Sequence, residues 1–141
     1  MLAPSRADAS TQFLKWLESM DGEGRIFLSA VTVVEIERGI PLLEKKGAVA
    51  KALGLRAWLS GLIATYDDKI IGLDTASAKF AGQLGAKAIA AGYNPGMADA
   101  IIAGIAKAHD LMVVTCNTKH FLPFGNDVAS PEEAVAIGQL K

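Results

Sequence analysis

The stretch "GMADAIIAGIAKAHDLMVVTCN", residues 96–117, places a carboxylate, Asp99, early in a run of alanine, isoleucine and glycine. At about 100° per residue along a helix, the isoleucines cluster on one face and Asp99 lies at its border, about 60° from Ile102. The segment "LMVVT" (111–115) then has the apolar β-forming residues of a buried strand. The stretch therefore predicts a helix that ends near His109 and leads into a strand, with a charged side chain at the edge of the core.

The rest of the chain alternates between the same two patterns. Short apolar runs predict strands at 25–30, at 69–73 and near 127–129. Helices are expected over 10–20, from 32 to a break at 39–41, from 42 to about 66, from an Asp74 cap to 91–92, and after a capping box formed by Ser130 and Glu133. In a chain of 141 residues, 51% of them hydrophobic, this alternation predicts one α/β domain over residues 1–141 with a mainly parallel sheet.

Composition gives no signal for a membrane or for a general attraction to nucleic acid. Lys and Arg number 14 and Asp and Glu number 15, so the formal net charge is −1. Cys116 is the one cysteine of the sequence, which excludes an internal disulfide, and "MLAPSRADAS" has neither the basic nor the apolar region of a signal peptide. The apolar stretches are too short to span a bilayer. We therefore expect a cytoplasmic protein.

Asp99 on its own has two interpretations. An aspartate in the first turn of a helix is favoured by the helix dipole and satisfies free backbone N–H groups, which is a purely structural role. The alternative is a site residue, because the start of this helix and the end of the strand at 111–115 can both lie at the carboxyl edge of a parallel sheet. Position alone leaves both open.

Glu35, in "TVVEIERGI", is a second candidate carboxylate. It follows the strand at 25–30 and shares a helix face with Gly39, whereas Glu37 lies about 200° away and is expected to face solvent. The structural interpretation is a capping box, in which Thr32 caps the helix and Glu35 reaches back to the cap N–H. The functional interpretation requires a partner for the carboxylate.

Further polar residues follow the strand at 111–115. Asn117 is either a turn residue or a ligand, and His120 is a candidate general base, metal ligand or surface residue. Neither histidine has the spacing of a zinc motif such as H-E-x-x-H, and no phosphate-binding glycine loop follows a strand. Cys116 lacks the histidine and acid that would make it a nucleophile.

Glu35, Asp99 and Asn117 lie in two motifs that resemble those of the PIN-domain ribonucleases, and most closely the VapC-type toxins of bacterial toxin–antitoxin pairs. The motifs are "LSAVTVVEIERGI" (28–40) and "GMADAIIAGIAKAHDLMVVTCNTKHF" (96–121), and the resemblance extends over nearly the whole chain. It implies a PIN-like three-layer α/β/α domain with a mainly parallel sheet. It also implies that Glu35, Asp99 and Asn117 form a catalytic metal site.

The resemblance further implies Mg²⁺ or Mn²⁺ as cofactor, RNA as substrate, a homodimer, and a small antitoxin protein that blocks the site. The physical chemistry agrees with the cofactor. Phosphodiester hydrolysis needs a cation to bear the developing charge and to supply a water nucleophile, and Mg²⁺ prefers hard oxygen ligands. Carboxylates held close together without a cation repel one another, so such a site is poised to recruit a divalent ion.

The sequence departs from the family pattern at three places. The family begins with a strand reading approximately Leu-Leu-Asp-Thr-Asn, whose aspartate is a principal metal ligand, and this sequence starts after that point. "LDT" does recur at 73–75, but there the family has a later strand and helix cap. The second departure is His120, which stands where many relatives have an acidic residue. The third is Asn117, which is a neutral ligand. We expect either that the gap left by the central strand is closed by rearrangement or by a neighbouring chain, or that the sequence is a shortened gene model or a fragment.

The sequence therefore predicts a VapC-type, Mg²⁺-dependent endoribonuclease that, without the first aspartate, binds metal weakly and cleaves RNA poorly. The alternative is a catalytically impaired PIN-like scaffold that acts as a protein- or RNA-binding module. An unrelated flavodoxin-like domain has less support, because it would need a phosphate-binding loop after a strand.

Overall fold

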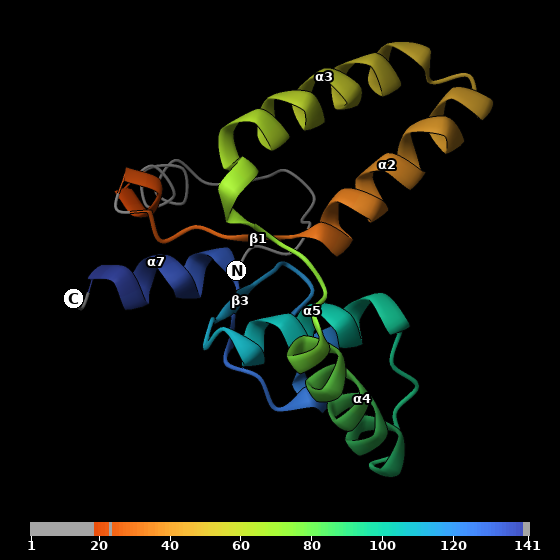
Figure 1. Cartoon of the computed structure of the whole chain (residues 1–141). Helices are drawn as coiled ribbons and strands as arrows, with labels where there is room; N and C mark the ends of the chain where they lie inside the picture. The colour runs from red at the N-terminus through yellow and green to blue at the C-terminus, as the bar shows by residue number, and fades with distance from the viewer. Residues whose placement is uncertain (1–18, 23, 140–141) are drawn as a thin grey trace.

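The structure is a computed structural model that describes residues 19–22 and 24–139 (Figure 1). The helix predicted over 10–20 lies outside these residues except for its end, and the chain is helical at 19–22. The expectation that the first strand of the family is missing is not tested by the described residues, and it stays a prediction.

Four two-residue strands in the described part form two separate parallel pairs. β1 (Leu28–Ser29) pairs with β2 (Ile70–Ile71), and β3 (Val113–Val114) pairs with β4 (Val128–Ala129). All four fall within the predicted apolar runs, and their parallel pairing confirms the α/β class. β1 is shorter than predicted because the Ser29 hydroxyl accepts a hydrogen bond from the N–H of Val31 and so begins the next helix.

Helices α2 (Ala30–Lys45) and α3 (Val49–Tyr66) form a hairpin at the upper right of Figure 1, and the 3₁₀ turn η1 (Asp67–Lys69) leads from it into β2. A cluster of buried residues lies between the two helices: Ile40, Ala52 and Leu59. No helix in the described part of the chain is long and apolar enough to cross a membrane.

The boundary between α2 and α3 differs from the predicted break at 39–41, which was wrong. α2 continues through Pro41. It ends before Gly47, whose φ of +85° is the left-handed conformation that terminates helices and whose N–H bonds to the carbonyl of Glu44. Pro41 removes one backbone hydrogen bond, but its fully buried neighbour Ile40 packs against α3 and keeps this turn of the helix in place.

Helices α4 (Thr75–Ala90) and α5 (Met97–Ala108) pack closely against each other and form most of the main core. α4 begins as predicted at Asp74, whose carboxylate accepts a hydrogen bond of 2.8 Å from the N–H of Ser77. At the helix crossing, a Cβ on Gly104 would stand only 2.6 Å from the carbonyl oxygen of Ser77 and from the amide nitrogen of Ala81. Because α5 is buried over most of its length, its first turn is held in a defined position.

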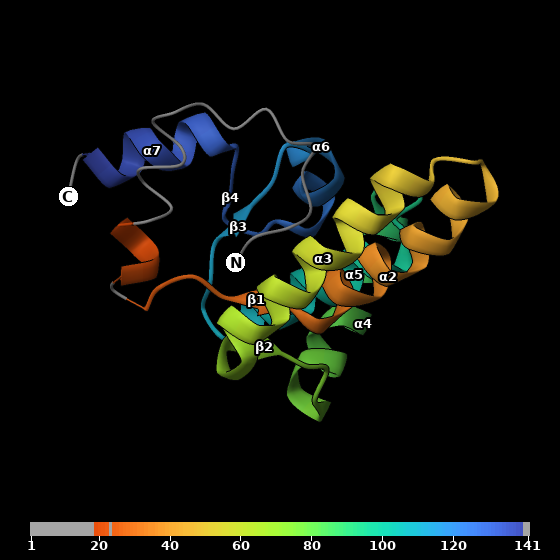
Figure 2. The same ribbon diagram turned by 90° about the horizontal axis from the view of Figure 1, so that it is seen from above.

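The chain after β3 contributes buried residues to the main core and to a smaller cluster between β4 and α7. α6 (Thr118–Phe121) and η2 (Leu122–Phe124) contribute two buried phenylalanines, and α7 (Pro131–Gln139) follows β4. Ser130 and Glu133 exchange two hydrogen bonds of 3.2 Å, which confirms the predicted capping box. Seen from above in Figure 2, α7 lies on the opposite side of β3 and β4 from the α2–α3 hairpin.

Candidate active site

A cleft of about 250 Å³ lies where α2, the start of α5 and the segment after β3 come together. Its lining includes all three residues that the sequence singled out, Glu35, Asp99 and Asn117. Ile102 and Phe121, both almost fully buried, contribute its apolar wall. The other lining residues are Gly96, Ala98, Thr115 and His120. The fold thus brings three distant parts of the chain to one place.

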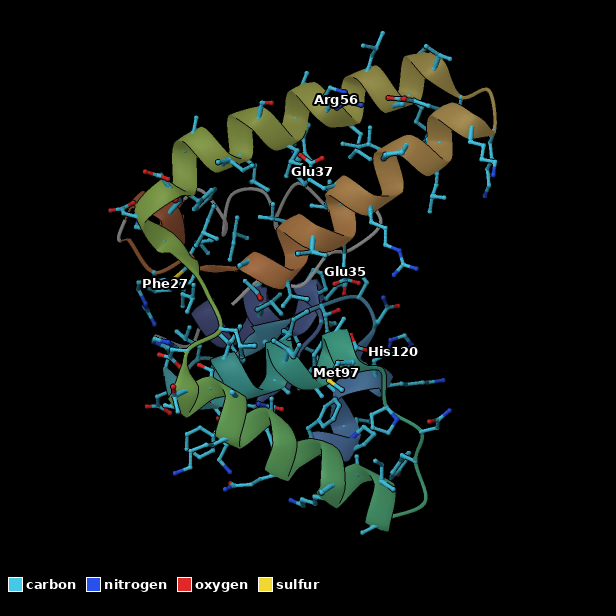
Figure 3. All side chains as sticks on the ribbon, turned by 45° about the vertical axis from the view of Figure 1, so that its right-hand side comes forward. Phe27, Glu35, Glu37, Arg56, Met97 and His120 are labelled. Carbon is cyan, nitrogen blue, oxygen red and sulfur yellow. The ribbon has the colours of Figure 1, made fainter. Side chains whose placement is uncertain are left out.

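Glu35 lies on the side of α2 that faces α5. In Figure 3 its carboxylate points toward the region of Met97 and His120, while Glu37 lies on a different side of α2, nearer α3. The expected separation of the two glutamates is therefore confirmed, and only Glu35 lines the cleft.

The alternative structural role for Glu35 was wrong. The N-cap of α2 is Ser29, so Thr32 is already inside the helix and cannot form a capping box with Glu35. Thr32 is buried, and its hydroxyl has no hydrogen-bond partner among the described residues. Glu35 therefore does not act as the capping-box partner at the start of α2.

Asp99 lies in the first turn of α5, whose N-cap is Gly96. Its side chain is 27% exposed, and its Oδ2 lies 3.4 Å from Nδ1 of His120. Burial raises the pKa of Asp99, and the nearby His120 opposes that rise. The carboxylate is therefore directed toward another side chain of the cleft, in addition to any favourable interaction with the helix dipole.

The charge of Asp99 affects the other carboxyl group of the cleft, that of Glu35. The pKa of Glu35 is raised, first by burial and second by the negative charge of Asp99. A nearby like charge disfavours ionisation because two anions repel one another. A cation bound between the two carboxyl groups would favour their ionised forms and so offset the rise in both pKa values.

Asn117 comes to the cleft through a turn at the end of β3. Thr115 is buried and its hydroxyl accepts a hydrogen bond of 3.0 Å from the N–H of Asn117. Asn117 stands at the N-cap position of α6, where its side chain makes no capping hydrogen bond. Asn117 thus stands in a turn, as one interpretation predicted, and it also lines the cleft.

His120 and Thr115 are the site residues that the sequence left undecided or missed. His120 had three possible roles, and the structure places it beside Asp99 in the cleft. Thr115 was taken only as the last strand residue, although a hydroxyl directly after the apolar run was a signal that this strand ends at a polar site.

The donor atoms of the cleft fit a hard divalent cation. Two carboxylates and one amide oxygen are the ligand types that Mg²⁺ accepts, and Mg²⁺ is commonly bound by one or two carboxylates while it keeps several waters. Within residues 19–22 and 24–139, no group of three or more His, Cys, Asp or Glu side chains is close enough to surround one ion. The described residues can therefore hold an ion only with the help of water or other ligands.

Comparison with known proteins places this cleft in a family. The PIN-domain family model matches residues 2–122, which is most of the chain. The chain belongs to the PIN-domain family. This confirms the predicted family and its α/β fold, and the cleft of Glu35 and Asp99 is where the two PIN-like motifs of the sequence meet.

Named relatives and solved structures agree with this assignment. The chain is 31% identical over 129 residues to Toxin FitB of Neisseria gonorrhoeae (strain ATCC 700825 / FA 1090), covering 89% of this chain and 87% of that protein. It is 28% identical over 129 residues to VapC ribonuclease Y4jK of Sinorhizobium fredii (strain NBRC 101917 / NGR234), covering 91% and 89%. The crystal structure of FitAcB from Neisseria gonorrhoeae superposes with a TM-score of 0.68 at 28% identity, covering 90% of this chain and 89% of that one.

Proposed function

We propose that this PIN-domain protein is a toxin of the VapC and FitB type that cleaves RNA phosphodiester bonds with the help of Mg²⁺ or Mn²⁺. The observation that carries the proposal is that Glu35 and Asp99 line one cleft from two different helices. The similarity to a toxin and to a VapC ribonuclease supports the substrate class. We further propose that residues 1–141 form one domain.

The roles of the side chains follow from their chemistry. A divalent cation supplies charge neutralisation and an acidified water for phosphodiester hydrolysis. Glu35 and Asp99 would hold that cation, directly or through water, and the carboxylate less engaged with it would orient the attacking water. The amide oxygen of Asn117 would assist in positioning the cation or the water, because Thr115 holds its backbone in place.

The same family relationship supports the proposed partners. The FitAcB structure contains a FitB-type relative within a named assembly, and this supports a small antitoxin protein as the partner that blocks the cleft. We propose a homodimer as the toxin's own assembly and the cytoplasm, where RNA is accessible, as its location.

A second function is favoured by one observation. Only two carboxylates line the described cleft, Glu35 and Asp99, so the site could bind RNA or a protein without cutting. In that case the chain would be a PIN-like binding module that has lost cleavage.

One experiment separates the two functions. The purified full chain is incubated with RNA in Mg²⁺, Mn²⁺ or a chelator, beside the variants Glu35→Gln and Asp99→Asn and the control Glu37→Gln. A nuclease would cleave in the presence of metal, lose about 100-fold of its rate in either cleft variant, and keep its rate in the control.

Each other result has a defined meaning. Cleavage that survives in Glu35→Gln would come from a contaminant or another site, and it would contradict the assignment of this cleft. RNA binding without cleavage by any form of the chain would favour the binding module.

A further inference from the structure

A second hollow, which we call the α4–α5 pocket, lies at the opposite end of α5 from the cleft. It has a volume of about 310 Å³ and is formed by the second half of α4, the end of α5 with the residues that follow it, and residues 124–127. Cavities that hold small organic ligands begin at about 300 Å³. The α4–α5 pocket therefore has room for one small molecule.

Four charged side chains line this pocket, two cations and two anions. They are Lys87 and Lys107 on the helices and Asp110 and Asp127 on the segments that follow them. In the part of the chain that the structure describes, none of the four forms an ion pair. A ligand that carries an anionic group together with hydrogen-bond donors can therefore interact with both kinds of side chain.

The two lysine ammonium groups have defined places beside the pocket. The Nζ of Lys87 lies 3.1 Å from the position that a Cβ on Gly125 would take, so the missing side chain of Gly125 leaves room for the ammonium group. The Nζ of Lys107 lies 5.2 Å from the centre of the Phe80 ring, which is within the range of a cation–π interaction. The pocket thus has a cation from α4 and a cation from α5.

Asp110 occupies a backbone position that usually belongs to glycine. Its φ is +53°, and among the described residues it is the one non-glycine residue with a positive φ. Its N–H bonds to the carbonyl of Lys107 and that of Leu111 to the carbonyl of Ala106, which is the Schellman pattern at a helix end. Glycine would adopt this conformation with less strain, so what the aspartate adds is a carboxylate at the pocket.

The rest of the lining is apolar or held in place by a hydrogen bond. Leu84 and Phe124 are almost fully buried. Nδ2 of Asn126 donates a hydrogen bond of 3.1 Å to the carbonyl of Ala103, which fixes the segment that carries Asp127. Oδ1 of Asn126 is buried and accepts no hydrogen bond from a described residue, and such an atom often marks a bound water or ligand.

We propose that the α4–α5 pocket binds one nucleotide, with its phosphate at Lys87 and Lys107 and the amino group of its base at Asp110 or Asp127. Ammonium groups bind phosphate oxygens, and carboxylates accept hydrogen bonds from the amino groups of bases. The flat face of the base lies against the apolar lining. The nucleotide is either free or an unpaired nucleotide of an RNA strand, because both present the same chemistry.

This second site goes beyond the proposed function and does not rest on it. The two ends of α5 lie about 15 Å apart along the helix axis, so a nucleotide in the pocket does not touch Glu35 or Asp99. The inference can therefore be tested without metal and without cleavage.

The test is an NMR titration of the full chain in the presence of a chelator. The probes are the four nucleoside 5′-monophosphates, uridine and cytidine without phosphate, inorganic phosphate, and a single-stranded RNA trinucleotide. The variants are Lys87→Met, Asp110→Gly and Asp99→Asn. The matched control is Lys79→Met, because Lys79 is an exposed lysine of the same helix and does not line the pocket.

The nucleotides should shift the amide signals of residues 124–127 with dissociation constants of about 1 mM or below. Adenine, guanine and cytosine nucleotides should bind about threefold or more tighter than the uracil nucleotide, which has no amino group. Lys87→Met should weaken all of them about threefold or more, whereas Lys79→Met and Asp99→Asn should change no affinity. Asp110→Gly should abolish the preference among bases and yet raise the melting temperature, which excludes unfolding as the cause.

Three results would overturn the proposal. The first is that no nucleotide shifts the pocket signals, and the second is that inorganic phosphate binds as tightly as the nucleotides or that Lys79→Met weakens binding as much as Lys87→Met. The third is that Asp99→Asn abolishes binding, since the nucleotide would then lie in the cleft and the proposed function would stand. Tighter binding of the trinucleotide than of the monophosphates would assign the pocket to an RNA strand, and equal or weaker binding to a free nucleotide.

Discussion

Glu35 of α2 and Asp99 of α5 line one cleft from two separate helices, and the negative charge of Asp99 raises the pKa of Glu35. Burial raises the pKa of both carboxyl groups. Without a cation, the pair lowers the stability of the folded state whenever both groups are ionised. Two carboxyl groups with raised pKa values in one cleft are typical of a functional site.

Glu35→Gln is expected to stabilise the metal-free protein at neutral pH. The raised pKa means that the folded state holds its proton to higher pH than the unfolded state does, so stability falls as pH rises from the ordinary value of 4.5 to the folded value. The substitution removes that loss. Because Glu35 is partly exposed and its charge is screened, we expect a gain of about 0.5 kcal/mol or less in the free energy of unfolding at pH 7.5.

Urea denaturation in the presence of a chelator measures this gain. It should disappear below pH 4.5, where Glu35 is protonated in both states. It should also shrink in the Asp99→Asn background, because the repelling charge is then absent. Glu37→Gln, on another side of α2, should give no comparable gain, and an equal gain there would contradict the assignment to the cleft.

Divalent metal is expected to raise the melting temperature of the wild type and not that of Asp99→Asn. An ion present at about 100 times its dissociation constant stabilises the folded state by about 2.7 kcal/mol, provided that it does not bind the unfolded chain. Thermal melts with Mn²⁺, followed by addition of a chelator, measure this change and its reversal. An identical shift in the wild type and in Asp99→Asn would exclude Asp99 as a ligand.

Gly104→Ala is expected to destabilise the protein by about 2 kcal/mol or more, because the new Cβ would overlap backbone atoms of α4. The contacts at 2.6 Å involve the backbone of Ser77 and Ala81, which cannot rotate away as a side chain would. Gly54→Ala in α3 is the matched control. Among the described residues, nothing outside its own helical backbone and chain neighbours lies within 4 Å of its Cβ position, and alanine there should stabilise the helix by about 0.5–1 kcal/mol. Chemical denaturation of both variants distinguishes close packing from a general effect of glycine.

Ser130→Ala is expected to cost about 1 kcal/mol, since it removes the hydroxyl that accepts the N–H of Glu133 at the start of α7. Hydrogen exchange of the α7 amides measures how often this helix opens locally, and faster exchange should be confined to α7. Ser60→Ala, at an exposed position inside α3, should be neutral or slightly stabilising. A comparable loss in Ser60→Ala would show that the capping hydrogen bond is not the cause.

The sequence predicted most elements of the fold because local signals and tertiary packing agreed. Asp74 and Ser130 cap the helices that they were expected to cap. At Pro41 the local signal failed, because a proline ends a helix only where packing does not hold the next turn, and the buried Ile40 does hold it. Gly47 shows the reverse case, since its left-handed φ became visible only in the structure.

The site was predictable as a set of residues and not as an arrangement. Helix periodicity placed Asp99 at the edge of the core, and the contact between α2 and α5 brings it near Glu35 of the other motif. Its separation from His120 depends on how α5 and the short helix α6 are packed, which no local pattern encodes. The close contact at Gly104 was unpredictable for the same reason.

The long burial of α5 has a genetic consequence. The helix that carries Asp99 at its first turn is the one whose other residues fill the core, so a change far along it displaces the carboxylate as well as weakening the fold. In a random mutagenesis screen for lost function, we expect substitutions at Ala103, Gly104 and Ile105 to be recovered together with those at Asp99. If the recovered positions were marked on the sequence alone, the functional site would be taken to include core residues that affect Asp99 only through packing.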